Sequence, residues 1–251
     1  GNSMKNKLFC IANWKMYLTN NQVKDYLETF SKYNINDNTK TEIVFCPSPV
    51  SLSLAKSYNK FNFGAQNFSE HATGPYTGEV SLSDVEEIGC KWVVLGHSER
   101  RTLFNETNKQ INKKMKLAYN SKLTPILCIG EDLDQMNSGK TEEILSIQIT
   151  EAFKNIKTDK NKTILLAYEP VWSIGTGVSA DLDIISNNVK LIKNIIKNNQ
   201  INCNIHILYG GSVNNINASS IINLKDIDGF LIGSSSIEPD IFYSIYKNIE
   251  Y

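Results

Sequence analysis

The sequence predicts an α/β protein whose single domain is a closed (β/α)8 barrel. Three observations support this fold. Short apolar runs recur eight times along the chain, segments with helical periodicity separate them, and polar residues follow the runs at their carboxyl ends. Eight such repeats in 251 residues match the usual size of this barrel. An open, doubly wound sheet of eight strands is the alternative that the same alternation allows.

The eight apolar runs are the predicted strands. In chain order they are KLFCIANWK, TEIVFCPSP, FNFGAQN, KWVVLGHSE, LTPILCIGE, TILLAYEP, IHILYGGS and DGFLIGSS. Few of them alternate between apolar and polar residues, as half-exposed strands do. Each strand is therefore expected to be buried on both faces of a parallel sheet.

The segments between these runs are the predicted helices. Apolar residues recur three and four positions apart in NQVKDYLETFSKY, NKQINKKMKLAYN, EEILSIQITEAFKNI and DIISNNVKLIKNIIKNN. This spacing gives each helix one apolar stripe, as expected where helices alternate with buried strands.

Charge and composition limit the classes of partner. Lys plus Arg and Asp plus Glu number 26 each, so no overall field attracts nucleic acid or an anionic membrane. Any anion site must be local. The sequence shows neither a leader pattern nor an apolar run of about 18 residues, and we expect a cytoplasmic protein without membrane contact.

Nothing in the sequence marks a second domain. No Pro-, Ser- or Gly-rich linker interrupts it, and we assign residues 4–251 to one barrel domain. Residues 1–3, GNS before Met4, are interpreted as an expression-tag remnant. The cysteines lack a zinc-binding spacing and are expected to be reduced core residues: Cys10, Cys46, Cys90, Cys128 and Cys203.

Asn13 and Lys15, in the motif ANWKM, are alternate residues at the end of the first predicted strand. Their side chains can point to the same face, which would place an amide donor and an ammonium on one side of the barrel mouth. A surface lysine is the alternative for Lys15.

His97, in LGHSERR, follows the fourth predicted strand. A helix N-terminus at that place favours the neutral imidazole. A hydrogen-bonded structural histidine is the alternative, and it is the interpretation that we prefer for His71 and His206.

Glu169 is the strongest candidate for a general base. It ends the apolar run TILLAY, where a carboxylate is costly to desolvate unless it has a function, and where burial favours binding of a proton. Pro170 stiffens the chain after it, and the glycines of GTG allow movement a few residues later, which indicates a lid. A carboxylate paired with an arginine is the alternative.

Two glycine-containing turns are candidates for an anion site. YGGSV and LIGSSS follow the last two predicted strands, and backbone N–H groups can approach a phosphate there because glycine lacks a Cβ. These loops are a recurrent phosphate site in barrels, although each motif alone is compatible with an ordinary turn. The whole set suits proton abstraction next to a carbonyl in a small phosphorylated molecule, and it calls for no metal or other cofactor.

Seven motifs together resemble those of the triosephosphate isomerase family, in the family order from about Phe9 to the C-terminus. They are NWKM, QNFSEHATGPYTGEVS, LGHSERR, CIGE, AYEPVWSIGTG, YGGSV and DGFLIG. The resemblance implies a TIM barrel and a cofactor-free isomerase. Such an enzyme interconverts dihydroxyacetone phosphate and D-glyceraldehyde 3-phosphate through an enediolate, in glycolysis and gluconeogenesis.

The resemblance also implies a role for each candidate. Glu169 would move a proton between two carbons, and neutral His97 would polarise the carbonyl; this family is a well-known case of both roles. Lys15 would offset negative charge, and Asn13 would donate a hydrogen bond to the substrate. A lid over residues 170–178 would close on the site. Backbone N–H groups would hold the phosphate, namely those of Gly175, Ser212, Gly233 and Ser234.

The resemblance further implies a homodimer. The TGPYTGE loop would enter the neighbouring subunit near NWKM, which makes Met16, Thr77 and Glu79 interface residues. Several positions depart from the common family pattern: Tyr17, Pro75, Ser173, Val178 and Ser234. Ser173 and Val178 lie in the predicted lid, and we expect them to affect the rate at which it closes rather than the chemical step.

Two other functions remain compatible with such a barrel. One is a different phosphosugar isomerase or an aldolase, but an aldolase needs a desolvated lysine inside the barrel, and Lys15 beside Asn13 is a poor candidate. The other is a non-catalytic binding or scaffold barrel, which would lack a Glu, His or Lys at the mouth. The sequence offers all three.

Overall fold

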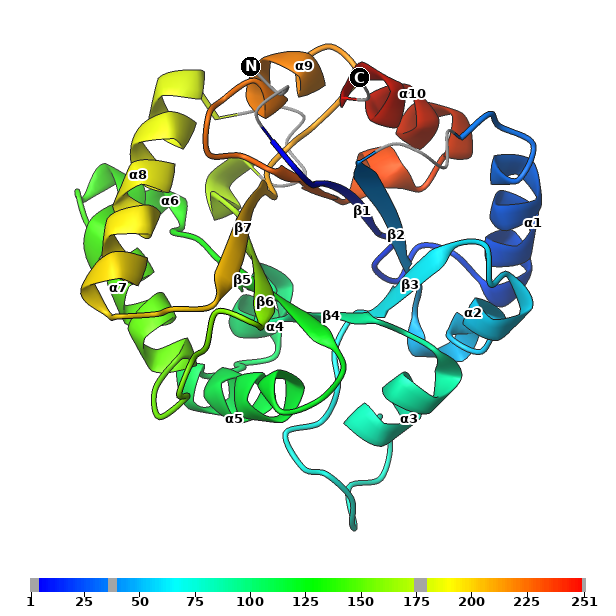
Figure 1. The fold of residues 1–251 in the computed structure, drawn as a ribbon, viewed down its shortest axis with the longest axis horizontal. Coiled ribbons are helices and arrows are strands. Elements are labelled where there is room, and N and C mark those ends of the chain that lie inside the picture. Colours follow the sequence, from blue (N-terminus) through cyan, green and yellow to red (C-terminus); the bar gives the residue numbers. More distant parts are fainter. Residues whose placement is uncertain (1–4, 36–39, 174–179, 250–251) are drawn as a thin grey trace.

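A closed barrel of eight parallel strands, in the order β1 to β8, forms the centre of the molecule, and helices surround it (Figure 1). The computed structural model describes residues 5–35, 40–173 and 180–249. The barrel closes because β1 also pairs with β8, with Phe9 opposite Gly229 and Ala12 opposite Ile232. The predicted (β/α)8 barrel is therefore confirmed, and the open doubly wound sheet is excluded.

Each predicted apolar run corresponds to one strand, although β7 begins one residue before its run, at Asn204. The strands are β1 Leu8–Asn13, β2 Thr41–Cys46, β3 Asn62–Ala65, β4 Trp92–Leu95, β5 Thr124–Ile129, β6 Thr163–Tyr168, β7 Asn204–Tyr209 and β8 Gly229–Ile232.

The strands are buried on both faces, as the sequence predicts. Alternate residues such as Phe9, Ile11 and Leu231 form an apolar cluster made of strand residues alone, which fills the barrel interior. Their neighbours, such as Leu8 and Cys10, pack with the helices in a larger outer cluster. Because both faces need apolar side chains, the alternating pattern of a half-exposed strand is lost.

The helices and three short 3-10 turns connect the strands. They are α1 Asn20–Phe30, η2 Pro49–Ser51, α2 Leu54–Ser57, α3 Leu82–Ile88, α4 Ser98–Leu103, α5 Asn108–Tyr119, α6 Leu133–Asn137, α7 Thr141–Ala152, η3 Val171–Ser173, α8 Leu182–Asn198, α9 Ala218–Ile222, η4 Ser234–Ser236 and α10 Pro239–Ile249. Capping boxes at Thr19, Thr107 and Asp132 fix where α1, α5 and α6 begin. Among the described residues, no helix combines the length and the apolar character that a membrane span needs.

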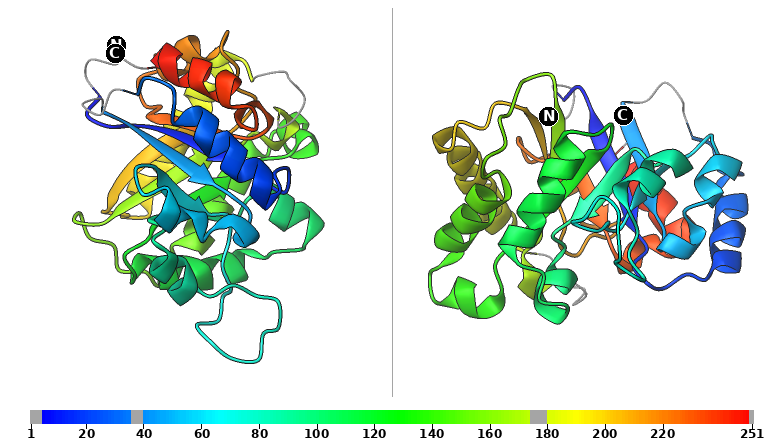
Figure 2. Two further views of the ribbon diagram at one scale, coloured as in Figure 1. Left: turned by 90° about the vertical axis from the view of Figure 1, so that its right-hand side faces the viewer. Right: turned by 90° about the horizontal axis from the view of Figure 1, so that it is seen from below.

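Residues 66–81, between β3 and α3, form an arm that projects from the barrel (Figures 1 and 2). Near its tip, His71 stacks on Tyr76 with ring centroids 3.8 Å apart. At its base, Gln110 of α5 donates a hydrogen bond to Glu70 at 3.3 Å. Thr77 and Glu79, the predicted interface residues, are exposed along this arm.

Polar side chains close the amino-terminal end of the barrel. His206 Nδ1 lies 2.9 Å from Asp228 Oδ2 just before β8. The ammonium of Lys5 donates to three backbone carbonyl groups, those of Ile222, Leu224 and Ile227. Burial lowers the pKa of Lys5. These contacts fasten the start of the described chain to its last quarter.

Candidate active site

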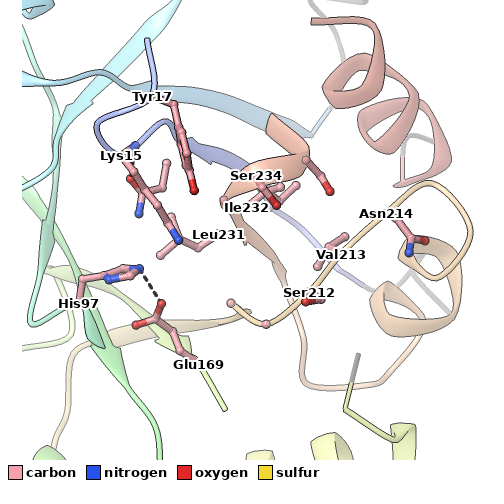
Figure 3. Close-up of a pocket in the computed structure, with 15 residues that line it drawn as sticks. Lys15, Tyr17, His97, Glu169, Ser212, Val213, Asn214, Leu231, Ile232 and Ser234 are labelled. Atoms are coloured by element: carbon pink, nitrogen blue, oxygen red, sulfur yellow. Dashed lines mark hydrogen bonds and ion pairs between the residues drawn. The ribbon is translucent and has the colours of Figure 1, made fainter. Parts of the chain in front are cut away.

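The carboxyl ends of the strands surround a cavity of about 100 Å³ (Figure 3). This volume suits a small metabolite. The cavity brings together residues that follow strands far apart in the sequence, namely Asn13, Lys15, His97, Glu169, Ser212, Gly233 and Ser234. Gly175, the remaining predicted phosphate ligand, lies outside the described residues.

Asn13 and Lys15 reach the cavity through a turn rather than through strand alternation. β1 ends at Asn13, and Lys15 follows with a φ of 50°, in the left-handed region. The Asn13 side chain accepts a hydrogen bond from the Lys15 backbone N–H at 3.0 Å. On the other side, Gln66 Nε2 donates to the Lys15 carbonyl at 2.8 Å. The predicted shared strand face is therefore wrong, although both side chains line the cavity.

Lys15 is not the surface lysine that the sequence left open. Its side chain is only 16% exposed, and its ammonium lies 2.8 Å from Oε1 of Glu99. The lysine therefore brings a paired positive charge to the cavity wall, and an anion bound there would share this ammonium with Glu99.

His97 precedes the first turn of α4, as predicted for a histidine at a helix N-terminus. Its Nδ1 accepts a hydrogen bond from the Glu99 backbone N–H at 3.1 Å, so this network assigns the ring proton to Nε2. Nε2 lies 2.9 Å from Oε2 of Glu169. The ring is thus held as a neutral donor that points into the cavity.

Opposing effects act on the pKa of His97. Burial lowers this pKa, but the adjacent carboxylate of Glu169 raises it, with help from Glu99, and the net direction is upward. The hydrogen bond at Nδ1, by contrast, requires a neutral ring. The raised pKa and the neutral ring are consistent with each other if the rise in the pKa of His97 depends on the negative charge of Glu169. Once that carboxylate accepts a proton, burial and the nearby Lys15 favour neutral imidazole, and Glu99 alone of the groups named here opposes them.

Glu169 is held in place by the strands on either side of it. Its backbone N–H donates to the Ile129 carbonyl at 2.7 Å, and the residue is 2% exposed. On the other side, a Cβ on Gly210 would lie 2.8 Å from Glu169 Cγ, so only glycine leaves room for this side chain. The carboxylate therefore faces His97 (Figure 3), and its partner is a histidine rather than an arginine.

The two glycine turns present unpaired backbone donors to the cavity. Among the described residues, the N–H groups of Ser212, Gly233 and Ser234 have no protein acceptor. All three residues line the same cavity as Lys15. Converging N–H groups beside a cation are typical of a phosphate site.

The polar residues that follow the apolar runs do not all line the cavity, and Glu131 and Arg101 lie outside it. Glu131 is fully buried, and its carboxylate accepts hydrogen bonds from the Tyr168 hydroxyl at 2.8 Å and the Thr141 hydroxyl at 3.1 Å. Burial raises the pKa of Glu131. Arg101 points away and donates to two backbone carbonyl groups.

Sequence reasoning missed the contacts through which three residues shape the site. Glu99 pairs with Lys15, Gly210 makes room for Glu169, and Tyr17 lines the cavity. Glu99 carries a signal in the sequence, because it lies in the first helical turn after His97. The roles of Gly210 and Tyr17 depend on tertiary contacts, which a local sequence pattern does not predict.

The sequence of this chain is similar to those of known proteins. The family model described as "Triosephosphate isomerase" matches residues 8–249. The chain belongs to the triosephosphate isomerase family. A triosephosphate isomerase from Dictyoglomus thermophilum is 39% identical, with 98% of this chain and 100% of the relative covered. The triosephosphate isomerase of Buchnera aphidicola subsp. Schizaphis graminum is 41% identical, with 97% of this chain and 98% of the relative covered.

Membership of the triosephosphate isomerase family decides between the functions that the sequence left open. The chain is an isomerase, and neither the aldolase nor the non-catalytic barrel is supported. In the described part of the chain, no group of three or more His, Cys, Asp or Glu side chains could hold a metal ion.

Proposed function

We propose that the cavity interconverts dihydroxyacetone phosphate and D-glyceraldehyde 3-phosphate with Glu169 as the base and His97 as the hydrogen-bond donor. The reaction itself is that of the triosephosphate isomerase family, in glycolysis and gluconeogenesis. The observation that supports these roles is the 2.9 Å contact between His97 Nε2 and Glu169 Oε2 in a cavity that also holds an ammonium and unpaired N–H groups.

The chemistry is the transfer of one proton between neighbouring carbons and of one proton between the two oxygens that these carbons carry. The Glu169 carboxylate takes the proton from the carbon next to the carbonyl, and the electron pair moves onto the carbonyl oxygen to give an enediolate. His97 Nε2–H and the Asn13 amide donate hydrogen bonds to the substrate oxygens, and the Lys15 ammonium offsets their charge. His97 then carries a proton from the hydroxyl oxygen to the former carbonyl oxygen, and return of the first proton from Glu169 to the other carbon gives the isomer. A well-placed base contributes about 10² to 10⁴-fold, so fixed dipoles must supply much of the remainder.

The phosphate group would bind to the backbone N–H groups of Ser212, Gly233 and Ser234, together with Gly175. Contacts next to residues 174–179 support a link between this site and the lid. The Ser212 hydroxyl donates to the Ser173 carbonyl at 2.5 Å, and the Ala180 N–H donates to the Tyr209 hydroxyl at 3.2 Å. Ser173 and Ala180, the residues on either side of this segment, are thus tied to the turn after β7 and to the end of β7. A closed lid would also keep the enediolate from losing phosphate to form methylglyoxal.

A coupled assay on D-glyceraldehyde 3-phosphate tests the proposal. Glu169→Gln keeps the shape of the side chain but removes the base, and kcat should fall by about 10² to 10⁴-fold. Glu169→Asp keeps the base but retracts it, and it should retain more activity than Glu169→Gln. A wild-type rate no higher than that of Glu169→Gln would refute the mechanism.

We also infer a homodimer in which the arm of one subunit enters a groove of the other. The groove is lined by the turn after β1, the base of the arm and the end of α4, and it includes Met16, Glu79, Leu103 and Phe104. Apolar side chains along it are strongly exposed, with Met16 at 93% and Leu103 at 69%. Exposed apolar patches of this kind mark interaction sites.

Sedimentation velocity over a range of concentrations tests the dimer. Leu103→Arg places a charge in the groove and should shift the chain toward monomer. Ile241→Arg is the matched control, because Ile241 is a partly exposed apolar residue on α10 outside this groove. A fully active monomer at low concentration would contradict the proposal that the dimer is the active unit.

A cytoplasmic location is proposed from the metabolic role. Cell fractionation with an antibody against this chain tests it, and recovery in an organelle or membrane fraction would contradict it.

A further inference from the structure

Tyr17 lines the substrate cavity, yet the proposed mechanism gives it no role. It shares the cavity wall with Lys15, Gly233 and Ser234. In Figure 3 its ring runs alongside Lys15, and its hydroxyl points into the cavity on the side where Ser234 lies. Tyr17 is therefore placed toward the end of the cavity where the unpaired N–H groups gather.

The turn that carries Tyr17 is fastened to one of the two phosphate-binding turns. The Tyr17 backbone N–H donates to the Trp14 carbonyl at 3.1 Å. Trp14 is fully buried, and its indole N–H donates to the Ser236 carbonyl at 3.0 Å. Ser236 belongs to η4, the turn that begins at Ser234. Trp14 thus fixes the position of Tyr17 relative to the donors at Gly233 and Ser234.

As far as the described residues go, the Tyr17 hydroxyl is an uncommitted hydrogen-bond donor. The hydroxyls of Tyr26, Tyr168 and Tyr243 all donate to protein oxygens. The Tyr17 hydroxyl makes no hydrogen bond within the part of the chain that the structure describes. Its side chain is half exposed, at the mouth of the cavity. No hydrogen bond to the described part of the chain therefore accounts for the hydroxyl at this position.

We propose that Tyr17 binds the phosphate group of the substrate, with its hydroxyl donating a hydrogen bond to a phosphate oxygen. This inference rests on the proposed function. The three terminal oxygens of a phosphate monoester accept more hydrogen bonds than the backbone donors at Ser212, Gly233 and Ser234 supply. The Lys15 ammonium is shared with Glu99. A phenol adds a donor from a third direction without adding charge.

Calorimetric titration of the full chain with inorganic phosphate tests the proposal. Tyr17→Phe removes only the hydroxyl and should weaken phosphate binding about tenfold, because hydrogen bonds to charged groups contribute at least that factor. The KM for D-glyceraldehyde 3-phosphate should rise by a similar factor, and kcat should change less. Tyr58→Phe is the matched control, because the Tyr58 hydroxyl bonds Glu28 on the outer surface at 2.7 Å.

Two outcomes would overturn the inference. One is wild-type affinity for phosphate in Tyr17→Phe, and the other is a loss confined to kcat, which would place Tyr17 in the chemistry instead. Failure of the proposed function would look different. A wild-type chain that binds phosphate in a Tyr17-dependent way but does not isomerise the triose would refute the function and leave the Tyr17 contact standing.

Discussion

Two histidine–carboxylate pairs lie at opposite ends of the barrel. At the carboxyl end, His97 Nε2 is 2.9 Å from Glu169, and at the amino end His206 Nδ1 is 2.9 Å from Asp228. The first pair is more deeply buried, with side chains 7% and 3% exposed against 18% and 22%. Since the two contacts are equally short, distance does not distinguish a catalytic pair from one that stabilises the fold.

The surroundings of the two pairs do distinguish them. The Nδ1 of His97 is occupied by the Glu99 N–H, which leaves Nε2 as the donor toward the cavity. His206 packs instead against the ring of Phe9, with centroids 5.1 Å apart. The His97–Glu169 pair borders a cavity that the unpaired N–H groups and the Lys15 ammonium also line. A histidine–carboxylate contact becomes a candidate for catalysis when a ligand can enter beside it.

Among the variants that test this comparison, the largest effect should come from moving Glu169 without replacing it. Gly210→Ala adds a Cβ that would lie 2.8 Å from Glu169 Cγ, while its nearest backbone neighbour stays at 3.4 Å. The carboxylate must therefore shift, and kcat should fall about 100-fold, as displacements of about 1 Å can cost. Steady-state kinetics measures this, and a circular dichroism melt checks the fold. Unchanged kcat would show that the position of Glu169 is not set by this contact.

The next prediction concerns the pKa of His97. In Glu169→Gln the carboxylate that raises this pKa is gone, while burial still lowers it, so the pKa should fall below its wild-type value. Titration of the ring resonances by NMR measures it. Because the pKa of His97 is higher in the folded than in the unfolded protein, protonation of His97 stabilises the fold. This stabilisation is complete below the unfolded-state pKa of about 6.5 and is lost as the pH rises through the folded-state pKa.

The pH dependence of stability provides an independent check. The pH-dependent part of the stability difference between wild type and Glu169→Gln should shrink as the pH rises through the wild-type pKa of His97. Denaturant unfolding at several pH values measures it. A difference that grows with pH would mean that Glu169 does not raise the pKa of His97.

The smallest effect is expected at the amino-terminal pair. His206→Ala removes a partly exposed contact with Asp228, and such contacts contribute up to about 1 kcal/mol to the free energy of unfolding. Because the pair is remote from the cavity, kcat should equal that of the wild type. Denaturant unfolding and the coupled assay measure the two quantities. A fall in kcat as large as that in Gly210→Ala would remove the distinction between the pairs.

The sequence predicts those parts of the site that depend on strand ends. Glu169 and His97 each follow an apolar run, and the fold then brings the carboxyl ends of parallel strands to one mouth. The turn at Lys15 could not be predicted, because its left-handed backbone is held by Gln66, which is distant in sequence. Glu131 also follows an apolar run, but Tyr168 and Thr141 bind its carboxylate away from the cavity, and only tertiary packing determines that.

The seam between β1 and β8 bears on how the chain is made. Gly229 stands opposite Phe9, and a Cβ there would collide with the Phe9 backbone, so the seam closes on a glycine. Almost the whole chain separates these residues. During translation β1 therefore has an open edge until the last strand leaves the ribosome, and open edges invite pairing with other chains. A ribosome that stalls before Gly229 would release a chain with a free edge and an incomplete cavity.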